Sequence, residues 1–394
     1  MKPASARSFR DLKPMTDGVS PITVEERRQR IEKARKLMVA GGLDAVYLEA
    51  GSSLFYFTGV CWWPSERMLA AVIPAKGEIA YVCPAFEEAR LRELLVGGDD
   101  VRTWQEHESP YALVAGILAD RGIAGGRIGI EETVRFFLFD GIGKEAPRAK
   151  LVGADAVTVG CRALKSPAEI ALMQRAMDIT VEAYKVCISL LAEGISQEEF
   201  AANAAAAHKA LGVQGGIGVQ FGQGTAFPHG SREATCLKAG DVVLMDGGCT
   251  VEGYHSDISR TIVFGEPTRR QRDVWALEKR AQAAAFAAAQ VGAACEDVDA
   301  AARKVIADAG FGPDYQVPGL PHRTGHGIGL DVHEWHHLVR GNRTPLAPGM
   351  CFTNEPMIAI YGEFGVRLED CMYLTEDGPR FFTQPSPSIE QPFA

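Results

Sequence analysis

The sequence predicts an α/β protein of two lobes, each with a hydrophobic core of its own. At 394 residues, the chain is longer than a single core usually serves. In its first part, short apolar stretches typical of strands alternate with helical patterns, which indicates an α/β lobe. In its second part, a leucine, a glycine and an acid recur at the same offsets in segments 237–246 and 346–355, which predicts a structural repeat.

The first lobe is predicted over residues 23–160. Residues 1–22 before it are polar, contain prolines and lack periodicity, so we expect a flexible arm there. The lobe begins with a helix, because Thr23 and Glu26 form a capping box and apolar residues then recur at helical spacing until a glycine pair. Strands are predicted at 44–49, 68–73, 79–83 and 127–130, and helices at 85–95 and 110–120.

The second lobe is predicted over residues 161–394. It begins with a long helix, because Ser166 is a suitable N-cap, Pro167 stands at the first helical position and Glu169 completes a capping box. Further helices are predicted from the capping box at 196–199 and in the alanine-rich segments 268–290 and 296–309.

The two repeated segments each predict a turn, then a strand that leads to a carboxylate, then a return strand that carries a second one. Buried carboxylates are costly unless they are paired or bind metal. Each acid alone is equally typical of a turn or of an exposed strand position, but a duplicated hairpin brings all of them to one place. The four acids are Asp246 and Asp257 in the first unit and Glu355 and Glu369 in the second.

A glycine-rich segment, 321–335, adds three histidines: His322, His326 and His333. Tight turns there would hold the imidazoles close to a site. Four oxygen donors and one nitrogen suit divalent ions such as Mn²⁺, Co²⁺ or Zn²⁺, and carboxylates that bridge favour two ions about 3.5 to 4 Å apart. The sequence therefore predicts a two-metal site that needs no sulfur ligand.

Bulk properties exclude several classes of function. Acidic residues outnumber basic ones by 50 to 41 and no basic stripe interrupts them, so nucleic acid is not an expected partner. No apolar run has the length of a membrane helix, and residues 1–20 lack a signal-peptide core, so we expect a cytoplasmic protein without a membrane partner. Nine scattered cysteines without a CxxC pair fit a reducing compartment. Those near the predicted site, expected to be small buried hydrophobes, are Cys249, Cys351 and Cys371.

With these residues, the chain resembles the pita-bread metallopeptidases, the family of prolidase (Xaa-Pro dipeptidase), aminopeptidase P and methionine aminopeptidase. The resemblance implies a creatinase-type amino-terminal α/β domain followed by a pita-bread catalytic domain with pseudo-two-fold αβ repeats. It is strongest to bacterial Xaa-Pro dipeptidases. The likeness runs from about residue 26 to 385 and is most specific at 245–248, 255–261, 322–333, 353–356 and 365–370.

The resemblance also implies which residue holds which ion. Asp246 would chelate one ion, Asp257 and Glu369 would bridge, and His326 and Glu355 would hold the second. Two divalent ions are expected, foremost Mn²⁺, with Co²⁺ or Zn²⁺ as alternatives. A bridging water is the implied nucleophile, and Glu355 would take its proton.

Outside these ligands, the resemblance implies catalytic roles for His229, His322, His333 and Arg367. His229 would stabilise the oxyanion or hold the carbonyl at the scissile bond; the alternative is a plain loop histidine. His322 and His333 would face the substrate, with His333 beside the proline ring. Arg367 would orient Glu369 or the substrate carboxylate, unless it forms a structural ion pair.

Two further residues, Trp63 and Arg67, lie in the first lobe. They are candidates to close a neighbouring site across a homodimer interface, because an aromatic wall suits proline and an arginine suits a free carboxylate. Core packing is the alternative. One position departs from the family: many relatives have a tyrosine directly after the histidine matching His229, whereas this chain has Gly230.

The implied activity is metal-dependent hydrolysis of Xaa-Pro bonds in proline-containing peptides, above all in dipeptides. An aminopeptidase P that cleaves longer Xaa-Pro peptides is the nearest alternative. Creatinase-like hydrolases lose the metal ligands, and a lyase of sulfonium compounds tends to carry an extra acid where Gly248 stands. A non-catalytic binding module would also be expected to lose ligands, whereas this chain keeps all five.

Overall fold

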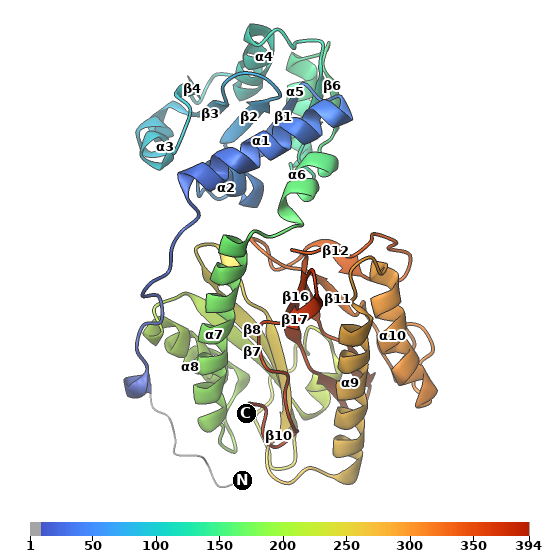
Figure 1. The fold of residues 1–394 in the computed structure, drawn as a ribbon. Coiled ribbons are helices and arrows are strands. Elements are labelled where there is room, and N and C mark those ends of the chain that lie inside the picture. The colour runs from blue at the N-terminus through green and yellow to red at the C-terminus, as the bar shows by residue number, and fades with distance from the viewer. Residues whose placement is uncertain (1–8, 394) are drawn as a thin grey trace. The chain divides into compact units, whose positions relative to one another are not determined.

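The computed structural model describes residues 9–393, which form two compact units (Figure 1). One unit is residues 22–162; the other is residues 163–393 together with 9–21. Of the predicted flexible arm, residues 1–8 lie outside the described residues. Residues 9–21 of the arm are hydrogen-bonded to the unit of residues 163–393. Met15 N donates to Leu211 O at 2.9 Å, and Arg175 Nη1 donates to Met15 O at 2.6 Å.

A six-stranded sheet with the order β4-β3-β2-β1-β5-β6 forms the centre of the amino-terminal unit. Strand β2 is antiparallel to both its neighbours, while the other neighbouring pairs are parallel. The predicted first helix is confirmed: the Thr23 side chain accepts a hydrogen bond from Glu26 N, and Gly42 ends the helix at φ +65°. The elements are α1 (Val24–Gly41), β1 (Ala45–Glu49), α2 (Ser52–Thr58), β2 (Ala70–Pro74), β3 (Ala80–Pro84), α3 (Glu88–Leu94), β4 (Asp100–Trp104), α4 (Pro110–Asp120), β5 (Arg127–Ile130), α5 (Phe136–Glu145), β6 (Lys150–Gly153) and α6 (Asp155–Arg162).

The carboxyl-terminal unit begins with two helices and a small sheet. The predicted capping boxes at Ser166 and Ser196 are both present. The sheet has the order β10-β8-β7, with β9 paired to β8. The elements are α7 (Pro167–Ser189), α8 (Gln197–Ala210), β7 (Gly215–Phe221), η3 (Gly222–Ala226), β8 (Val242–Val251), β9 (Tyr254–His255) and β10 (Ile258–Val263).

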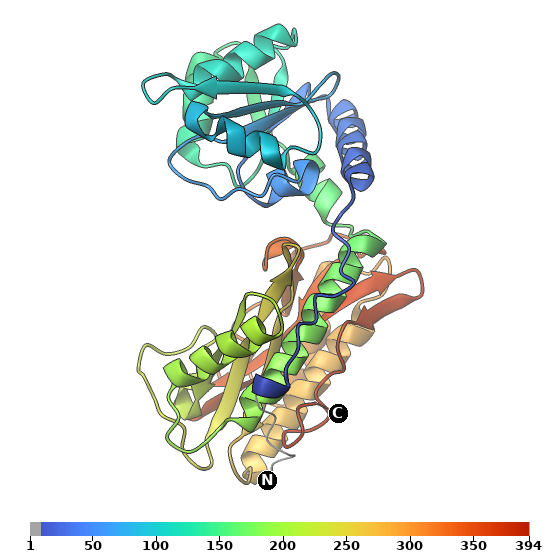
Figure 2. The ribbon, with the colours of Figure 1, turned by 90° about the vertical axis from the view of Figure 1, so that its left-hand side faces the viewer.

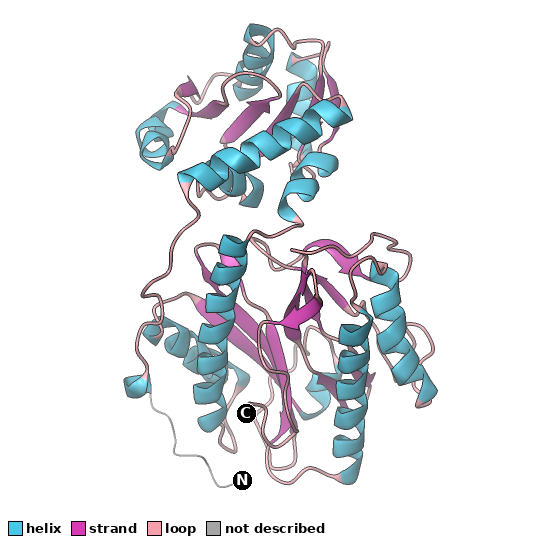
Figure 3. Ribbon diagram, in the orientation of Figure 1, coloured by secondary structure: helices cyan, strands magenta, loops and turns pink. Residues whose placement is uncertain are grey.

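The second half of this unit again places two helices before a sheet. Its five strands have the order β12-β11-β13-β16-β17, and β14 and β15 form a separate hairpin. In Figure 2 the helices of the unit lie against its strands, and Figure 3 shows the pair α7 and α8 on one side and α9 and α10 on the other. The elements are α9 (Arg269–Ala288), α10 (Cys295–Asp308), β11 (Gly325–Gly327), β12 (Glu334–Leu338), β13 (Cys351–Asn354), β14 (Met357–Ile360), β15 (Phe364–Arg367), β16 (Asp370–Thr375) and β17 (Gly378–Phe381).

The predicted repeat is confirmed in the backbone. Strands β8 and β10 are antiparallel, and so are β13 and β16. Before each pair, a glycine turns the chain with positive φ: +87° at Gly240 and +90° at Gly349. A backbone bridge between Ser259 and Glu369 joins the two halves. The α/β class with pseudo-two-fold αβ repeats is therefore the fold of this unit.

Two further expectations concern helices and cysteines. Within residues 9–393, every helix is too short or too polar to span a bilayer. All nine cysteines are free, and the three near the candidate site are buried as expected.

Candidate metal site

All five predicted metal ligands lie in the carboxyl-terminal unit, in strands of the two repeats or directly beside them. Asp246 lies in β8, Asp257 directly precedes β10, and His326 lies in β11. Glu355 follows β13, and Glu369 stands between β15 and β16. The hairpins explain this arrangement, because antiparallel pairing sets acids from distant parts of the chain on neighbouring strands.

Four of these ligands approach one another directly. Ligand atoms of Asp257, His326 and Glu369 all lie within 4.8 Å of one another. His326 Nε2 is 3.3 Å from Glu355 Oε1 and 3.8 Å from Asp257 Oδ2. A cation bound between these four side chains would replace their direct contacts with one another by contacts with the ion.

Ser259, which the sequence argument did not select, joins the fifth ligand to the group. Its hydroxyl lies 2.9 Å from Asp246 Oδ1 and 2.6 Å from Glu369 Oε2. Arg367 Nε donates to the same hydroxyl at 3.0 Å. Thr353 has a similar role, because its hydroxyl accepts from His326 N and donates to Glu355 Oε1. Both lie two residues from a predicted acid, which is the one sequence signal that marks them.

The charges of the group fit bound cations. Burial and the neighbouring carboxylates raise the pKa of both Asp257 and Glu369, because several negative charges share one enclosed space. Glu369 Oε1 is buried and has no hydrogen-bond partner within the described residues. Burial lowers the pKa of His326 to about 3, so its imidazole is neutral, and Nδ1 faces Gly327 O at 3.0 Å while Nε2 faces the carboxylates. Carboxylate oxygens with a neutral imidazole nitrogen are ligands for divalent ions.

Arg367 contacts two of the predicted ligands, one directly and one through a hydroxyl. Its Nη2 lies 2.5 Å from Asp246 Oδ2, and its Nη1 donates to Pro228 O at 3.2 Å. Its Nε donates to the Ser259 hydroxyl, which in turn donates to Glu369 Oε2, so Arg367 reaches Glu369 through Ser259. Arg367 also fixes the loop that carries His229.

The three histidines outside the ligand set surround this group. The His333 ring lies edge-on to His326, with 4.2 Å between ring centroids. His322 Nδ1 lies 2.7 Å from Arg323 O, its buried Nε2 has no partner within residues 9–393, and burial lowers its pKa to about 4. His229 is exposed and directly follows Pro228, whose carbonyl accepts a hydrogen bond from Arg367.

Gly230 has a structural explanation. Its φ is +80°, and a Cβ built there would lie 2.3 Å from Gln220 Nε2. That amide is anchored, since Gln220 Oε1 accepts from Gln197 Nε2 at 3.0 Å and from Ser231 N at 3.3 Å. A tyrosine would therefore require both a strained backbone and displacement of Gln220.

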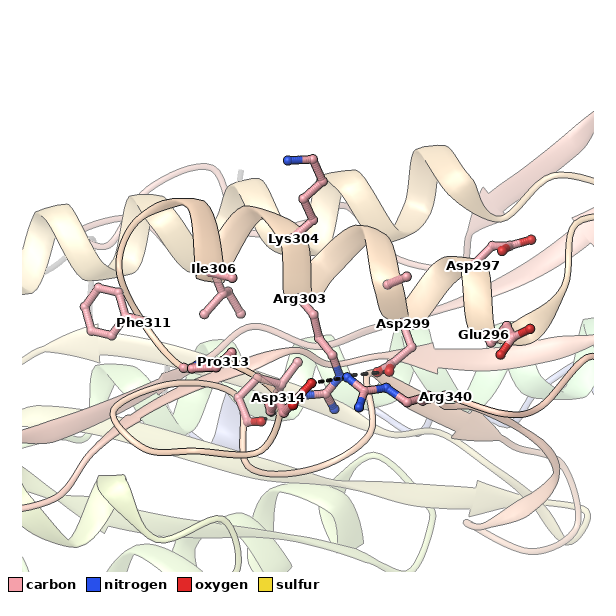
Figure 4. Close-up of a pocket in the computed structure, with 14 residues that line it drawn as sticks. Glu296, Asp297, Asp299, Arg303, Lys304, Ile306, Phe311, Pro313, Asp314 and Arg340 are labelled. Carbon is pink, nitrogen blue, oxygen red and sulfur yellow. Dashed lines mark hydrogen bonds and ion pairs between the residues drawn. The ribbon is translucent and has the colours of Figure 1, made fainter.

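A buried ion pair on α10 holds the histidine-bearing segment from behind. Arg303 and Asp299, one turn apart on α10, form an ion pair with 2.8 Å between Nε and Oδ2. Both line a cavity of about 380 Å³ (Figure 4). Arg303 Nη2 also donates to His322 O at 2.5 Å, and Asp299 Oδ1 accepts from Thr324 N and Oγ1. The pair therefore fixes the backbone on both sides of Arg323.

Trp63 and Arg67 belong to the amino-terminal unit. The Trp63 side chain is 83% exposed, so core packing is excluded for it. Arg67 makes two hydrogen bonds of 3.0 Å to Glu106. Its guanidinium also lies 5.5 Å from the centre of the Phe86 ring.

Comparison with known proteins identifies the family of each unit. Residues 171–376 match the model of metallopeptidase family M24, and residues 30–164 match the creatinase/prolidase N-terminal domain. An Xaa-Pro dipeptidase from Lactobacillus delbrueckii is 31% identical over 91% of this chain and 98% of its own length. The structure of dipeptidase PepE from Mycobacterium ulcerans has a TM-score of 0.86 at 31% identity, covering 95% of this chain and all of that one. A prolidase from Thermococcus sibiricus has a TM-score of 0.84 at 30% identity, covering 91% and 97%.

Proposed function

Because this chain belongs to metallopeptidase family M24, we propose that it is a prolidase that hydrolyses Xaa-Pro dipeptides with two divalent metal ions. The observation that carries the proposal is the convergence of Asp257, His326 and Glu369 within 4.8 Å, in a chain whose two domains match those of prolidases. Asp246 and Glu355 complete the ligand set. We further propose Mn²⁺ as the native ion, a homodimer and a cytoplasmic location.

Different residues of the chain have different proposed roles in hydrolysis. When bound, the two ions lower the pKa of a shared water and polarise the scissile carbonyl. We assign to Glu355 the role of accepting the proton of the attacking water; its carboxylate lies 3.3 Å from His326 Nε2, and burial raises its pKa. His229 and His333 are the proposed donors of hydrogen bonds to the carbonyl oxygen as it gains negative charge.

Glycine at position 248 supports a peptidase over the sulfonium lyase. A Cβ at Gly248 would lie 1.9 Å from the backbone oxygen of Ser256, so no acid fits there without moving β8. The two remaining candidates, prolidase and aminopeptidase P, differ in the length of peptide that they accept. The solved relatives include a protein described as a prolidase and one described as an X-Pro aminopeptidase.

The proposal is tested with a cleavage panel. The protein, reconstituted with Mn²⁺ or Co²⁺, is incubated with Ala-Pro, Leu-Pro, Ala-Pro-Ala and longer Xaa-Pro peptides, and released amino acids are quantified. We expect cleavage of the dipeptides in preference to the longer peptides. Preference for longer peptides would identify an aminopeptidase P, and absence of cleavage throughout would refute the proposed function.

His333→Ala is expected to lower kcat by about 100-fold while the metal content stays at the wild-type level. The reason is that the His333 ring contacts His326 but is not among the ligand atoms that converge; loss of one polarising donor has about this effect. Turnover of Ala-Pro and metal analysis measure the two quantities, with His107→Ala, at an exposed histidine of the amino-terminal unit, as control. Loss of metal in His333→Ala would show that His333 is a ligand.

A further inference from the structure

Helix α9 carries a buried glutamine on the face that packs inward. Gln282 is 2% exposed, and it lies on the same buried side of α9 as Glu278 and Ala285. A buried side-chain amide is costly unless its hydrogen-bonding groups have partners. The partners of Gln282 therefore indicate what its side chain does in the fold.

The side-chain amide of Gln282 binds the residues directly before two of the predicted metal ligands. Its Nε2 donates to Leu368 O at 3.1 Å and to Asn354 O at 3.4 Å. Leu368 precedes Glu369, and Asn354 precedes Glu355. In return, Asn354 Nδ2 donates to Gln282 O at 2.9 Å. One residue of α9 thus joins the two chain segments that carry these acids.

These contacts lie at the point where the strand ladder ends. The pairing of β13 with β16 ends where Asn354 lies opposite Asp370. Glu355 and Glu369 stand just beyond that pair, so the ladder bonds no longer fix the distance between the two segments. Gln282 Nε2 also donates to Asp370 Oδ2 at 3.1 Å, so its amide binds both residues of the last pair.

The backbone amides of the two acids do not connect them to each other. Glu355 N donates to Thr324 O at 2.8 Å, and Glu369 N donates to Ser259 O at 3.2 Å. Each of these bonds fixes one acid to a different part of the unit. The contacts of Gln282, in contrast, reach both segments, and an ion held by both carboxylates is sensitive to their separation.

We propose that Gln282 is a positioning residue that holds Glu355 and Glu369 at a separation at which one metal ion can bind both. This inference rests on the proposed function, in which His326 also binds that ion. Without the Gln282 amide, the two segments would have to be drawn together as the ion binds. That cost lowers the affinity for the ion, because a site that is ordered in advance binds more tightly.

Gln282→Met tests this role, because methionine keeps the length of the side chain and removes both donors; Gln282→Leu is a second variant without donors. In calorimetric titration of the metal-free protein with Mn²⁺, we expect one of the two ions to bind at least about 10-fold more weakly, the range for lost support of a metal ligand. The Mn²⁺ concentration that gives half-maximal cleavage of Ala-Pro should rise by the same factor.

Hydrogen exchange of the metal-free proteins supplies a measurement that depends on neither metal nor turnover. Peptides that contain Glu355 and Glu369 should exchange faster in Gln282→Met than in the wild type, since the two segments open more often once the amide is lost. Peptides from the amino-terminal unit should exchange at the wild-type rate. Unchanged exchange around both acids would contradict the proposed contact.

The matched control is Gln271→Met, at a buried glutamine of the same helix whose Nε2 donates to Gly240 O at 3.0 Å. It should lower the melting temperature without weakening Mn²⁺ binding. Unchanged Mn²⁺ affinity in Gln282→Met, or an equal loss in Gln271→Met, would overturn the positioning role. A wild type that binds no Mn²⁺ would overturn this role and the proposed function together. If the wild type binds two ions and cleaves no Xaa-Pro peptide, the proposed function is refuted, while a selective loss in Gln282→Met still supports the positioning role.

Discussion

Asp257→Asn is expected to abolish both peptidase activity and stoichiometric metal binding. Asp257 is the residue that we propose would contact both ions, because its carboxylate lies in the group with His326 and Glu369. An amide keeps the size of the side chain but removes the negative charge that attracts the cations. Loss of metal removes an effect of several kcal/mol on the barrier, so kcat/KM on Ala-Pro should fall by about 10³-fold or more.

Elemental analysis and thermal melting separate this outcome from misfolding. Mn²⁺ should raise the melting temperature of the wild type, because an ion that binds only the folded state stabilises it. The same ion should leave the melting temperature of Asp257→Asn nearly unchanged. The control is Asp273→Asn, at an exposed acid on α9. Two bound ions and ordinary turnover in Asp257→Asn would show that Asp257 does not bridge.

The four acids could be predicted from sequence because the pattern is local. Each follows, precedes or lies within an apolar strand segment, and Asp246 and Glu355 stand at the same offset from a turn glycine. A hairpin then sets the position of the acid on each return strand. Ser259 could not be selected in this way. Its role depends on its hydrogen bond to Glu369, which is 110 positions away in the chain. The backbone bridge that joins the two halves brings the two residues together.

Other parts of the site depend on facts that only the fold supplies. The sequence argument left three roles open for Arg367, namely orienting Glu369, binding the substrate carboxylate and forming a structural ion pair. Nothing in the sequence indicates that Arg367 pairs with Asp246. For Trp63 the sequence argument left core packing and closure of a neighbouring site as alternatives, and only the exposed side chain in the fold excludes core packing.

The second prediction with a large effect concerns stability. Arg260→Met is expected to lower the free energy of unfolding of the metal-free protein by about 3–5 kcal/mol, the usual result of leaving one charge of a buried pair alone. Arg260 and Asp370 are both fully buried, with 2.7 Å between Nη2 and Oδ1. Arg260 Nη1 also donates to the carbonyl of Glu369 at 2.8 Å, so the substitution removes a support of a metal ligand.

Urea unfolding in the presence of a chelator measures the effect without a contribution from metal. The matched control is Arg270→Met, because Arg270 pairs with Glu363 at the surface, where an ion pair contributes about 0–1 kcal/mol. Replacing both partners, as Arg260→Met with Asp370→Leu, should recover part of the loss, since no uncompensated charge then remains. A loss for Arg260→Met no larger than that for Arg270→Met would show that water reaches Asp370. In that case the pair would not be what holds Glu369 in place.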